Sequence, residues 1–305
     1  MKILSLFSGC GAFEISAQRS PHLTTIAVAE NDPYPAAVLQ HHFPEIPNLG
    51  DVTTIDATKY RGAVDVVVGG SPCQDFSVNG DRRGLGGEKS SLLFHQVRVA
   101  YECEAPWFVW ENVVGANSSN GGADFAAVLG LLVRCGYSVA WRRLRATDFG
   151  LPQSRDRLLL VGHLGADPEK PARVLAFDKS YPWANPAIAW DCEGEVRDQL
   201  SQATFGFNGK RHLGTAQLER CPTLLAGGHR TTWSNDGNNM AVISPKGIRW
   251  LSHCEKCKLQ GFPAGWLDIP DVPRRFRHKI IGNSIPVPFC EFVLNGIAEE
   301  SAERF

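Results

Sequence analysis

The stretch of residues 69–77, Gly-Gly-Ser-Pro-Cys-Gln-Asp-Phe-Ser, contains the side chain best suited to covalent chemistry, Cys73. It directly follows the apolar run at 64–68, which predicts a buried strand. Cys73 is therefore expected at the carboxyl end of a strand, where open α/β sheets bind their ligands. A cysteine in such a crevice can act as a thiolate nucleophile, whereas a cysteine buried among apolar side chains is inert.

Two further segments supply groups that could act on the same substrate. Residues 110–113, Trp-Glu-Asn-Val, end another strand pattern and are expected to bring Glu111 to the same edge of the sheet as Cys73. Residues 153–157, Gln-Ser-Arg-Asp-Arg, precede a later strand, and Arg155 and Arg157 offer planar donor groups for a base or a phosphate. The segment Gly282-Asn283-Ser284 stands just before the last helical pattern.

A glycine-containing turn at residues 7–11, Phe-Ser-Gly-Cys-Gly, follows the first strand pattern and leads into a helix. Glycines here let the backbone pass close to a nucleotide-like ligand, and the helix N-terminus adds a favourable dipole. Glu30 ends the second strand pattern, a position from which a carboxylate can accept hydrogen bonds from ribose hydroxyl groups.

Alternating strand and helix patterns must position these groups. Strands are expected at 2–7, 25–30, 64–68, 107–110, 138–144 and 158–161. Helices are expected from 13, and at 35–42, 92–103 and 125–135. This alternation predicts an α/β fold with a mostly parallel, doubly wound sheet.

The pattern of residue types changes after about residue 165. Helical periodicity fades there, and turn pairs such as Asn208-Gly209 and Asp236-Gly237 separate short extended runs. Helical patterns resume at 253–260 and 286–298. We therefore expect a catalytic and cofactor-binding domain over 1–165, completed by 278–305, and a smaller, loop-rich domain over 166–277.

The 305 residues, 43% apolar with a net charge of −1, can form a sizeable core but do not describe a uniformly basic protein. Positive charge gathers locally in two clusters: Arg142, Arg143, Arg145, Arg155 and Arg157; and Arg274, Arg275, Arg277 and Lys279. Nine scattered cysteines indicate reduced thiols and a cytoplasmic protein. Cys254-x-x-Cys257 lacks a second pair, so no metal is expected. The apolar run at 3–7 is too short for a signal peptide, and no run reaches membrane-spanning length.

In this order, these motifs resemble those of the DNA (cytosine-5)-methyltransferases. The series is the glycine turn, Pro-Cys-Gln at 72–74, Glu-Asn-Val at 111–113, Gln-x-Arg-x-Arg at 153–157, a variable stretch, Leu-Gln-Gly-Phe-Pro at 259–263 and Gly-Asn-Ser at 282–284. The resemblance covers almost the whole chain. It implies a Rossmann-like methyltransferase domain and a target-recognition domain, with S-adenosylmethionine as cofactor and double-stranded DNA as substrate.

The resemblance also implies roles for individual residues. Cys73 would be the nucleophile, Glu111 the acid that touches the cytosine, and Arg157 a donor to its carbonyl oxygen, supported by Arg155. Glu30 would bind the ribose and Asp51 the adenine amino group. The other cofactor-binding residues would be Phe7, Ser8, Gly9, Gly11, Ala12, Val52, Pro72, Leu92, Asn283 and Ser284.

DNA contacts are expected from two regions. The glycine-rich stretch at 74–88 is typical of a loop that closes on DNA, although a passive surface loop remains open. The candidates for DNA contact are Gln74, Ser77, Arg82, Arg83, Asn112, Thr223 and Arg230. The variable stretch at about 166–245 is short, which favours a single target sequence.

Two alternatives remain beside this interpretation. A tRNA cytosine-5 methyltransferase shares the architecture and the Pro-Cys-Gln motif, but its Cys-Phe-Thr signature is not found here, and Thr223-Leu224 resembles the element of DNA-type recognition regions. An inactive adaptor of the same fold is expected to lack Cys73, Glu111 or the glycine turn, and all are present. A monomer is expected, and a partner restriction endonuclease is left open.

Overall fold

The computed structural model describes residues 1–72, 91–176, 204–207, 214–217, 221–224, 240–244 and 247–302. These residues form two compact units. The first unit comprises Met1–Leu144, Arg157–Phe177 and Cys290–Phe305, and the second comprises Arg145–Asp156 and Asp178–Phe289.

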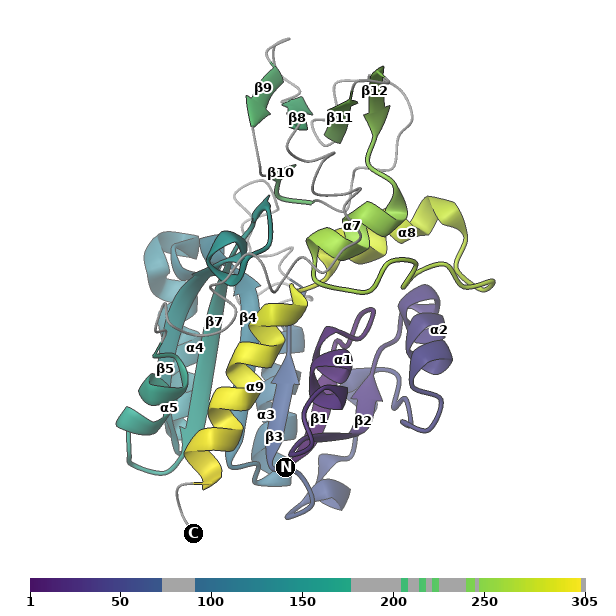
Figure 1. Ribbon diagram of the computed structural model, residues 1–305. Helices are drawn as coiled ribbons and strands as arrows, with labels where there is room; N and C mark the ends of the chain where they lie inside the picture. The colour runs from purple at the N-terminus through teal and green to yellow at the C-terminus, as the bar shows by residue number, and fades with distance from the viewer. Residues whose placement is uncertain are drawn as a thin grey trace. The chain divides into compact units, whose positions relative to one another are not determined.

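The first unit is built on a six-stranded sheet in the order β2-β1-β3-β4-β7-β5 (Figure 1). The strands are β1 (Lys2–Leu6), β2 (Thr24–Ala29), β3 (Val66–Gly69), β4 (Trp107–Val113), β5 (Tyr137–Arg145) and β7 (Asp156–Leu164). Strands β2, β1, β3 and β4 pair in parallel, whereas β7 runs antiparallel to β4. The α/β fold class predicted from the sequence is therefore confirmed.

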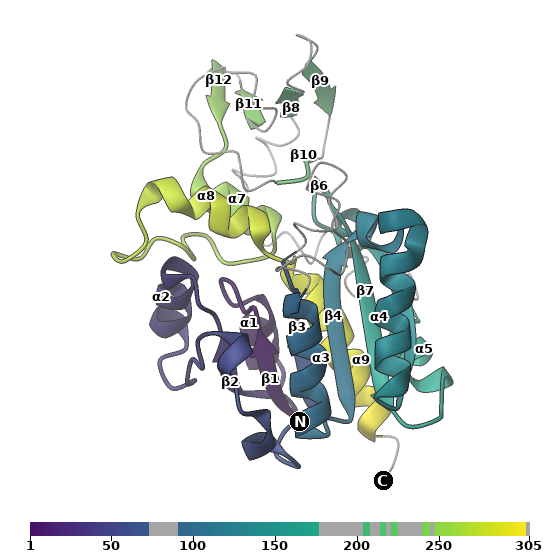
Figure 2. The same ribbon diagram turned by 180° about the vertical axis from the view of Figure 1, so that it is seen from behind.

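Helices cover both faces of this sheet. α1 (Ala12–Gln18), α5 (Glu169–Val174) and α9 (Val287–Ala302) lie on one face, and α3 (Ser91–Cys103) and α4 (Ala123–Arg134) lie on the other (Figures 1 and 2). The strands are buried from both sides, which explains why burial in β1 and β3 is continuous after Lys2 rather than alternating along the strand. α2 (Pro33–His42) starts where the Asp32 carboxylate accepts from the Tyr34 backbone N–H and Pro33 stands at the first helical position.

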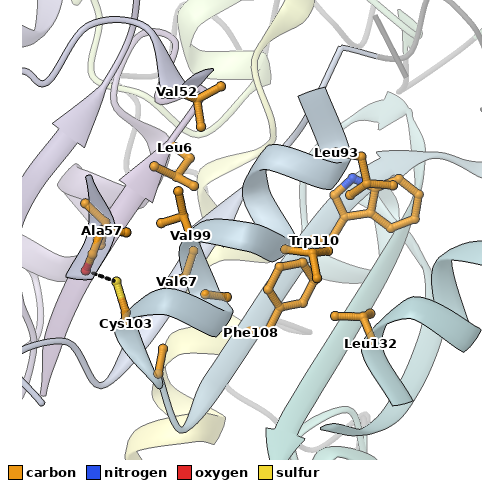
Figure 3. Close-up of a cluster of buried hydrophobic side chains, with 14 of the residues drawn as sticks. Leu6, Val52, Ala57, Val67, Leu93, Val99, Cys103, Phe108, Trp110 and Leu132 are labelled. Carbon is orange, nitrogen blue, oxygen red and sulfur yellow. Dashed lines mark hydrogen bonds between the residues drawn. The ribbon is translucent and has the colours of Figure 1, made fainter. Parts of the chain in front are cut away.

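A single apolar cluster fills the space between the sheet and the α3–α4 layer (Figure 3). Phe108 and Trp110 of β4 lie fully buried in it, and Leu132 of α4 packs there as well. Cys103 at the end of α3 donates from its thiol to the Ala57 carbonyl oxygen at 3.5 Å. This cluster includes Leu6, Val67 and Trp110, which stand near the carboxyl ends of β1, β3 and β4.

Short 3₁₀ turns link these elements. They are η1 (Val52–Thr54), η2 (Ala57–Tyr60), η4 (Val114–Asn117), η5 (Ser119–Gly122) and η6 (Ala146–Phe149). Each predicted strand of the first unit forms with its ends within three residues of the expectation, and the four predicted helices form as well.

The second unit contains a four-stranded sheet in the order β12-β11-β8-β9 and a two-stranded pairing of β10 with β6. Its strands are β6 (Gln153–Ser154), β8 (Thr204–Phe207), β9 (Gly214–Gln217), β10 (Cys221–Pro222), β11 (Met240–Ser244) and β12 (Gly247–Trp250). The β12-β11-β8-β9 neighbours pair antiparallel, whereas β10 and β6 run parallel. Two helices follow, α7 (His253–Leu259), which starts with a Ser252/Glu255 capping box, and α8 (Arg274–Asn283).

Helix α8 was not predicted; its residues were interpreted only as a basic cluster. Five of its first six residues are basic, and within the helix Phe276 and Ile280 are the single apolar pair that precedes the buried end at 280–282, a pattern too short to predict a helix. The two units place 145–156 and 278–289 in the second unit and 166–177 in the first, whereas the division into a catalytic and a target-recognition domain stays a prediction.

No single described helix is long and apolar enough to cross a membrane; only the bent pair α8 and α9 passes that test together, by length and composition.

Candidate active site

The turn after β1 adopts a backbone that depends on glycine. Phe7, Gly9 and Gly11 all have positive φ angles, of 54°, 56° and 91°. A Cβ on Gly11 would lie 2.8 Å from a ring carbon of Phe43, so a side chain is excluded there by contact as well as by conformation. Among the described residues, a Cβ on Gly9 would meet nothing closer than the Phe7 carbonyl oxygen at 4.0 Å. Conformation rather than contact with a described residue therefore favours glycine at this position.

Glu30 is held against this turn. Its Oε2 accepts from the Gly9 backbone N–H at 2.9 Å, and its Oε1 accepts from the Asp32 backbone N–H at 2.8 Å. Burial raises the pKa of the Glu30 carboxyl above its usual value, while these two backbone donors act in the opposite direction. The turn and the carboxylate, predicted separately from the sequence, thus form one cluster at the carboxyl ends of β1 and β2.

Asn48, which the sequence analysis did not single out, joins Glu30 to the segment that carries Asp51. Its Oδ1 accepts from the backbone N–H groups of Glu30 and Gly50, each at 3.0 Å, and its amide donates to the Glu30 carbonyl oxygen at 3.0 Å. Asp51 caps η1 by accepting from the Thr53 N–H at 2.9 Å, which lowers the pKa of Asp51 below its usual value.

The η1 turn is fixed to helix α3 through one guanidinium group. Arg98 donates to the carbonyl oxygens of Val52 at 3.0 Å and Ile55 at 2.9 Å, and pairs with Glu102 at 2.8 Å. Val52 is buried, and Leu92, at the start of α3, is half-buried against the core. Val52 on η1 and Leu92 on α3, two candidates for cofactor binding that are distant in sequence, therefore lie on elements that contact one another.

Side chains of α3 and β4 hold the end of β3 and the residues that follow it, up to Pro72, by hydrogen bonds. Gln96, fully buried on α3, donates to the carbonyl oxygens of Val109 at 2.9 Å and Gly69 at 3.5 Å. The Trp110 indole donates to the Ser71 hydroxyl at 3.0 Å. The Asn112 amide donates to the Ser71 carbonyl oxygen at 3.3 Å.

Asn112, which is expected among the DNA-contacting residues, is engaged with the backbone in the described structure. Its side chain is 2% exposed, and both ends of its amide are engaged, because its Oδ1 accepts from the Val113 N–H at 2.8 Å. It holds the segment before Cys73 rather than facing outward. Gln96 and Trp110 serve the same segment and were missed; the signal for Gln96 was a polar residue at core spacing between Leu93 and Ala100.

Glu111 and Arg157 form an ion pair, with Arg157 Nε 2.8 Å from Glu111 Oε1 and both side chains 12% exposed. Gly70 lies directly against this pair, since a Cβ built on it would be 2.9 Å from Glu111 Oε2. The two predicted catalytic groups of the first unit therefore lie next to the segment that leads into Cys73.

Arg155, by contrast, is a buried residue that joins three backbone segments of the second unit by hydrogen bonds. Its guanidinium donates to the carbonyl oxygens of Leu224 at 2.8 Å, Gly282 at 3.1 Å and Ser284 at 2.6 Å. Its side chain is 1% exposed, so these three bonds hold it inside the unit. They support a positioning role for Arg155, whose catalytic role stays a prediction, and they explain why 145–156 and 282–284 belong to one unit.

The remaining candidates fall in three groups. Asn283 is exposed and Ser284 buried at the end of α8 in the second unit, where the Thr223 hydroxyl also donates to the Ser154 carbonyl oxygen. Ser8 and Ala12 are buried in the first unit, and Pro72 is exposed. The candidates outside the described residues are Cys73, Gln74, Ser77, Arg82, Arg83 and Arg230.

Among the described residues, no group of three or more His, Cys, Asp or Glu side chains could hold a metal ion. Of the Cys-x-x-Cys pair on α7, Cys257 is buried and the Cys254 thiol donates to Asp268 Oδ2 at 3.6 Å.

Comparison with known proteins agrees with this geometry. The family model described as C-5 cytosine-specific DNA methylase matches residues 1–219 and 195–299. The Type II methyltransferase M2.BsuMI of Bacillus subtilis is 29% identical over 98% of this chain and 76% of its own length. The Type II methyltransferase M.NlaX of Neisseria lactamica is 28% identical over 98% of this chain and 95% of its own length. The Dnmt2 methyltransferase of S. pombe shares the fold, with a TM-score of 0.67 at 15% identity over 98% of both chains.

The sheet, the glycine turn with its carboxylate and the Glu111–Arg157 pair define a Rossmann-like methyltransferase. The chain belongs to the C-5 cytosine-specific DNA methylase family. It is an S-adenosylmethionine-dependent DNA (cytosine-5)-methyltransferase, and the enzyme class expected from the sequence is confirmed.

Proposed function

We propose that the chain methylates carbon 5 of a flipped-out cytosine in a specific duplex DNA sequence, through a covalent adduct with Cys73. The observation that carries this proposal is the Glu111–Arg157 pair against Gly70, three residues before Cys73 in the chain. Three extended residues span about 10 Å at most, so the length of chain after Gly70 is compatible with the proposed reaction beside this pair.

The glycine turn and Glu30 fit the proposed cofactor site. No described residue lies within 4.0 Å of a Cβ built on Gly9 except Phe7, which suits the close approach of a ligand to the backbone, and the Glu30 carboxylate has the acceptors that two ribose hydroxyl groups require. Asp51 and Val52 of η1 would contact the adenine, as the family resemblance implies. When bound there, S-adenosylmethionine supplies an electrophilic methyl group.

The side chains of the site would then act on the cytosine in turn. The Cys73 thiolate adds to carbon 6, and the electrons of the ring double bond move towards the ring nitrogen, where protonated Glu111 donates a proton. Arg157 donates to the cytosine carbonyl oxygen, where negative charge develops. Carbon 5 then takes the methyl group, and loss of its proton with departure of Cys73 restores the ring.

This chemistry requires the base to leave the helix, because neither face of a stacked cytosine is accessible. Flipping costs a few kcal/mol, which contacts to the base and the opened duplex offset. We assign these contacts to the stretch at 74–88 and to the second unit, whose candidates include Thr223 and Arg230. The Type II names of the relatives support DNA as the substrate and a restriction-modification setting. The likeness to Dnmt2 concerns the fold alone, so no observation favours the tRNA alternative.

The nucleophile is tested by Cys73→Ser. Methyl transfer should fall by several orders of magnitude, because losing a covalent nucleophile costs about that much, while binding of S-adenosylmethionine stays nearly unchanged. Duplexes that carry 5-fluorocytosine should trap the wild-type chain covalently, because fluorine cannot leave carbon 5 as a proton does. Residual turnover above about a hundredth of wild type would rule out the covalent mechanism.

The cofactor site is tested by Glu30→Ala with calorimetry. Two charge-assisted hydrogen bonds to ribose are lost, so affinity for S-adenosylmethionine should fall about ten- to a hundred-fold. Glu45→Ala, which removes an exposed carboxylate beyond α2, serves as the control. Unchanged affinity in Glu30→Ala would assign the ribose contact to another residue.

A further inference from the structure

The first turns of helix α8 carry positive charges to which the proposed function gives no role. Residues 274–279 are Arg-Arg-Phe-Arg-His-Lys, and Arg274, Arg275 and Lys279 are exposed. No acidic residue stands in the first turn of the helix. Because a helix N-terminus already has a partial positive charge, arginine side chains there oppose the helix dipole. An anionic partner would compensate for this unfavourable arrangement.

Arg277, in the same run, has a different task, because it fixes the helix to the chain before it. Its guanidinium pairs with the Asp268 carboxylate and donates to the carbonyl oxygens of Val272 at 3.0 Å and Ile269 at 3.3 Å. The Asp268 carboxylate also accepts from the Cys254 thiol at 3.6 Å. Asp268 is therefore engaged with Arg277 and Cys254 rather than with the exposed arginines.

Arg274 and Arg275 form no ion pair with any carboxylate of the described residues. The central carbon of the Arg275 guanidinium lies 4.8 Å from the centre of the Phe276 ring. Contact with an aromatic ring orients a guanidinium and leaves its N–H donors available. Arg275 and Lys279 stand four residues apart, so they share one side of the helix. We call the exposed group of Arg274, Arg275 and Lys279 the basic face of α8.

The other end of α8 is bonded to a segment with a DNA-contact candidate. Arg155 donates to the carbonyl oxygens of Gly282 at 3.1 Å and Leu224 at 2.8 Å, and Leu224 directly follows the candidate Thr223. Arg274 stands eight residues before Gly282, which is about 12 Å along a helix. The basic face therefore belongs to an element that is attached to this segment and can reach the same duplex.

We propose that the basic face of α8 binds the phosphate backbone of the duplex that the chain methylates. Regularly spaced phosphates complement a row of exposed cations, and each guanidinium can donate two parallel N–H groups to phosphate oxygens. Since the whole chain has a net charge of −1, local surfaces of this kind must attract DNA. The contact holds the duplex without selecting its sequence. This inference rests on the proposed function, because it takes duplex DNA as the substrate.

An anionic lipid surface fits the same charges less well. Helices that bind membrane surfaces insert exposed apolar side chains beside their cations. Phe276, the apolar residue within 274–279, is half-buried, and Ile280 is buried. The observations therefore favour a polyanion that is bound through its charges alone.

The test is the salt dependence of DNA binding by the full chain, measured by fluorescence anisotropy. One labelled duplex contains the methylated site, as located by bisulfite sequencing, and a second of equal length lacks it. In Arg274→Ala/Arg275→Ala, the slope of log affinity against log salt should become shallower by about 1.8, at about 0.9 for each lost phosphate contact. Between about 50 and about 200 mM salt, this variant should lose about ten-fold less affinity than wild type. Both duplexes should respond equally, and the KM for DNA should rise with little change in kcat.

Three comparisons separate this contact from general effects of charge or folding. Lys59→Ala/Arg134→Ala removes two exposed positive charges from the first unit and should keep the wild-type slope. Arg274→Lys/Arg275→Lys should keep most of the slope, because the charges remain. The free energy of unfolding of Arg274→Ala/Arg275→Ala should equal or exceed that of wild type, because two charges that oppose the helix dipole are removed.

Three results would overturn the proposal while leaving the proposed function intact. The first is a wild-type slope in Arg274→Ala/Arg275→Ala although the wild type binds DNA. The second is a loss confined to the duplex with the methylated site, which would make these arginines readers of bases. The third is an unchanged DNA slope together with lost binding to vesicles of anionic lipid, which would assign the basic face to a membrane. A wild type that neither binds nor methylates duplex DNA would instead remove the proposed function itself, and this inference with it.

Discussion

Glu111 and Arg157 meet although they stand 46 positions apart in the chain. Arg157 lies opposite Val113 in the antiparallel pairing of β4 with β7, and Glu111 is two residues before Val113 on β4. Residues two apart on a strand share a face, so the two side chains are diagonal neighbours, and Arg157 Nε comes within 2.8 Å of Glu111 Oε1. Arg157 lies near the start of β7 and Glu111 near the end of β4, and these two ends meet at the same edge of the sheet because β7 runs antiparallel to β4.

Replacing Arg157 by alanine should therefore remove two things at once, the partner of a poorly exposed carboxylate and the proposed donor to the cytosine. We expect kcat to fall about a hundred- to a thousand-fold, the usual cost of losing a donor to developing charge. Affinity for S-adenosylmethionine should change little, because Arg157 is not among the proposed cofactor contacts. Methyl incorporation into DNA and calorimetry measure the two effects.

Arg134→Ala is the matched control, since this arginine is exposed at the end of α4. Arg157→Lys should recover only a small part of the activity, because an ammonium group cannot reproduce the planar donor geometry. Turnover within about three-fold of wild type in Arg157→Ala would exclude the donor role.

The sequence was sufficient to place most of the first unit, and the reason is physical. A buried parallel strand needs a continuous apolar run, and 64–68 or 107–110 can hardly be interpreted otherwise. The motif order then predicted which strand ends carry Glu30 and Glu111. The direction of β7 was not predictable in this way, because an apolar run has the same pattern in parallel and antiparallel pairing.

The role of Arg155 could not be obtained from sequence either. In Gln-x-Arg-x-Arg the two arginines look equivalent, yet Arg157 points to a carboxylate and Arg155 to three carbonyl oxygens. Only the fold brings the Leu224, Gly282 and Ser284 carbonyl groups around one of them. The backbone contacts of Asn112 were not predictable for the same reason, since a polar side chain in a motif can serve a neighbouring backbone as well as a substrate.

Gly70 should be intolerant of any side chain. A Cβ at this position would lie 2.9 Å from Glu111 Oε2, so Gly70→Ala must displace either the carboxylate or the backbone that leads to Cys73. We expect methyl transfer to fall at least ten-fold, in line with the sensitivity of catalysis to small misplacements, with little change in S-adenosylmethionine binding.

Gly130→Ala provides the comparison, because its Cβ would meet only the flexible end of Arg134, at 3.4 Å, within α4. That variant should keep full activity and gain up to about 1 kcal/mol of stability from helix propensity. Equal activity of Gly70→Ala and Gly130→Ala would show that the Gly70–Glu111 contact is unimportant.

Arg155 should matter for stability rather than for the chemical step. Arg155→Met would leave three carbonyl oxygens without their donor in a buried site, at a cost of about 1–3 kcal/mol for each group that finds no water. We expect a clear loss in the free energy of unfolding, measured by urea titration. At low temperature the folded fraction should retain kcat within about ten-fold. A folded Arg155→Met chain without any turnover would restore the catalytic assignment.

Glu14 should make stability depend on pH. Its folded-state pKa of about 7 lies above the ordinary value of 4.5, so the folded chain prefers the protonated group. Stability from this preference is complete below about pH 4.5 and is lost as pH rises through about 7, which amounts to at most about 3 kcal/mol. Glu14→Gln should therefore be more stable than wild type at about pH 8 and no more stable at about pH 5. The free energy of unfolding of both proteins is measured by denaturant titration at the two pH values. The same difference between Glu14→Gln and wild type at about pH 5 and about pH 8 would contradict this prediction.

Sequence choice should reside in the second unit. The groups proposed to act on the cofactor or on the flipped cytosine are not free to read neighbouring base pairs, and the stretch at 74–88 is assigned to the opened duplex. Residues at about 178–245, by contrast, are rich in turns and in donors suited to base edges and phosphates. Arg230→Ala should either relax discrimination at one base pair by about 1–3 kcal/mol or weaken all sites alike and flatten the salt dependence. Bisulfite sequencing of host DNA distinguishes these results.

A chimera tests the assignment as a whole. Replacing 178–245 with the matching region of a related methyltransferase should transfer that relative's target sequence. The graft must preserve the pairing of Cys221 and Pro222 with Gln153 and Ser154 and the Leu224 carbonyl that Arg155 binds, because these contacts fix the region to 145–156. An active chimera that still methylates the original site would place recognition in the first unit. One that methylates the relative's site would show that the first unit supplies chemistry without sequence choice.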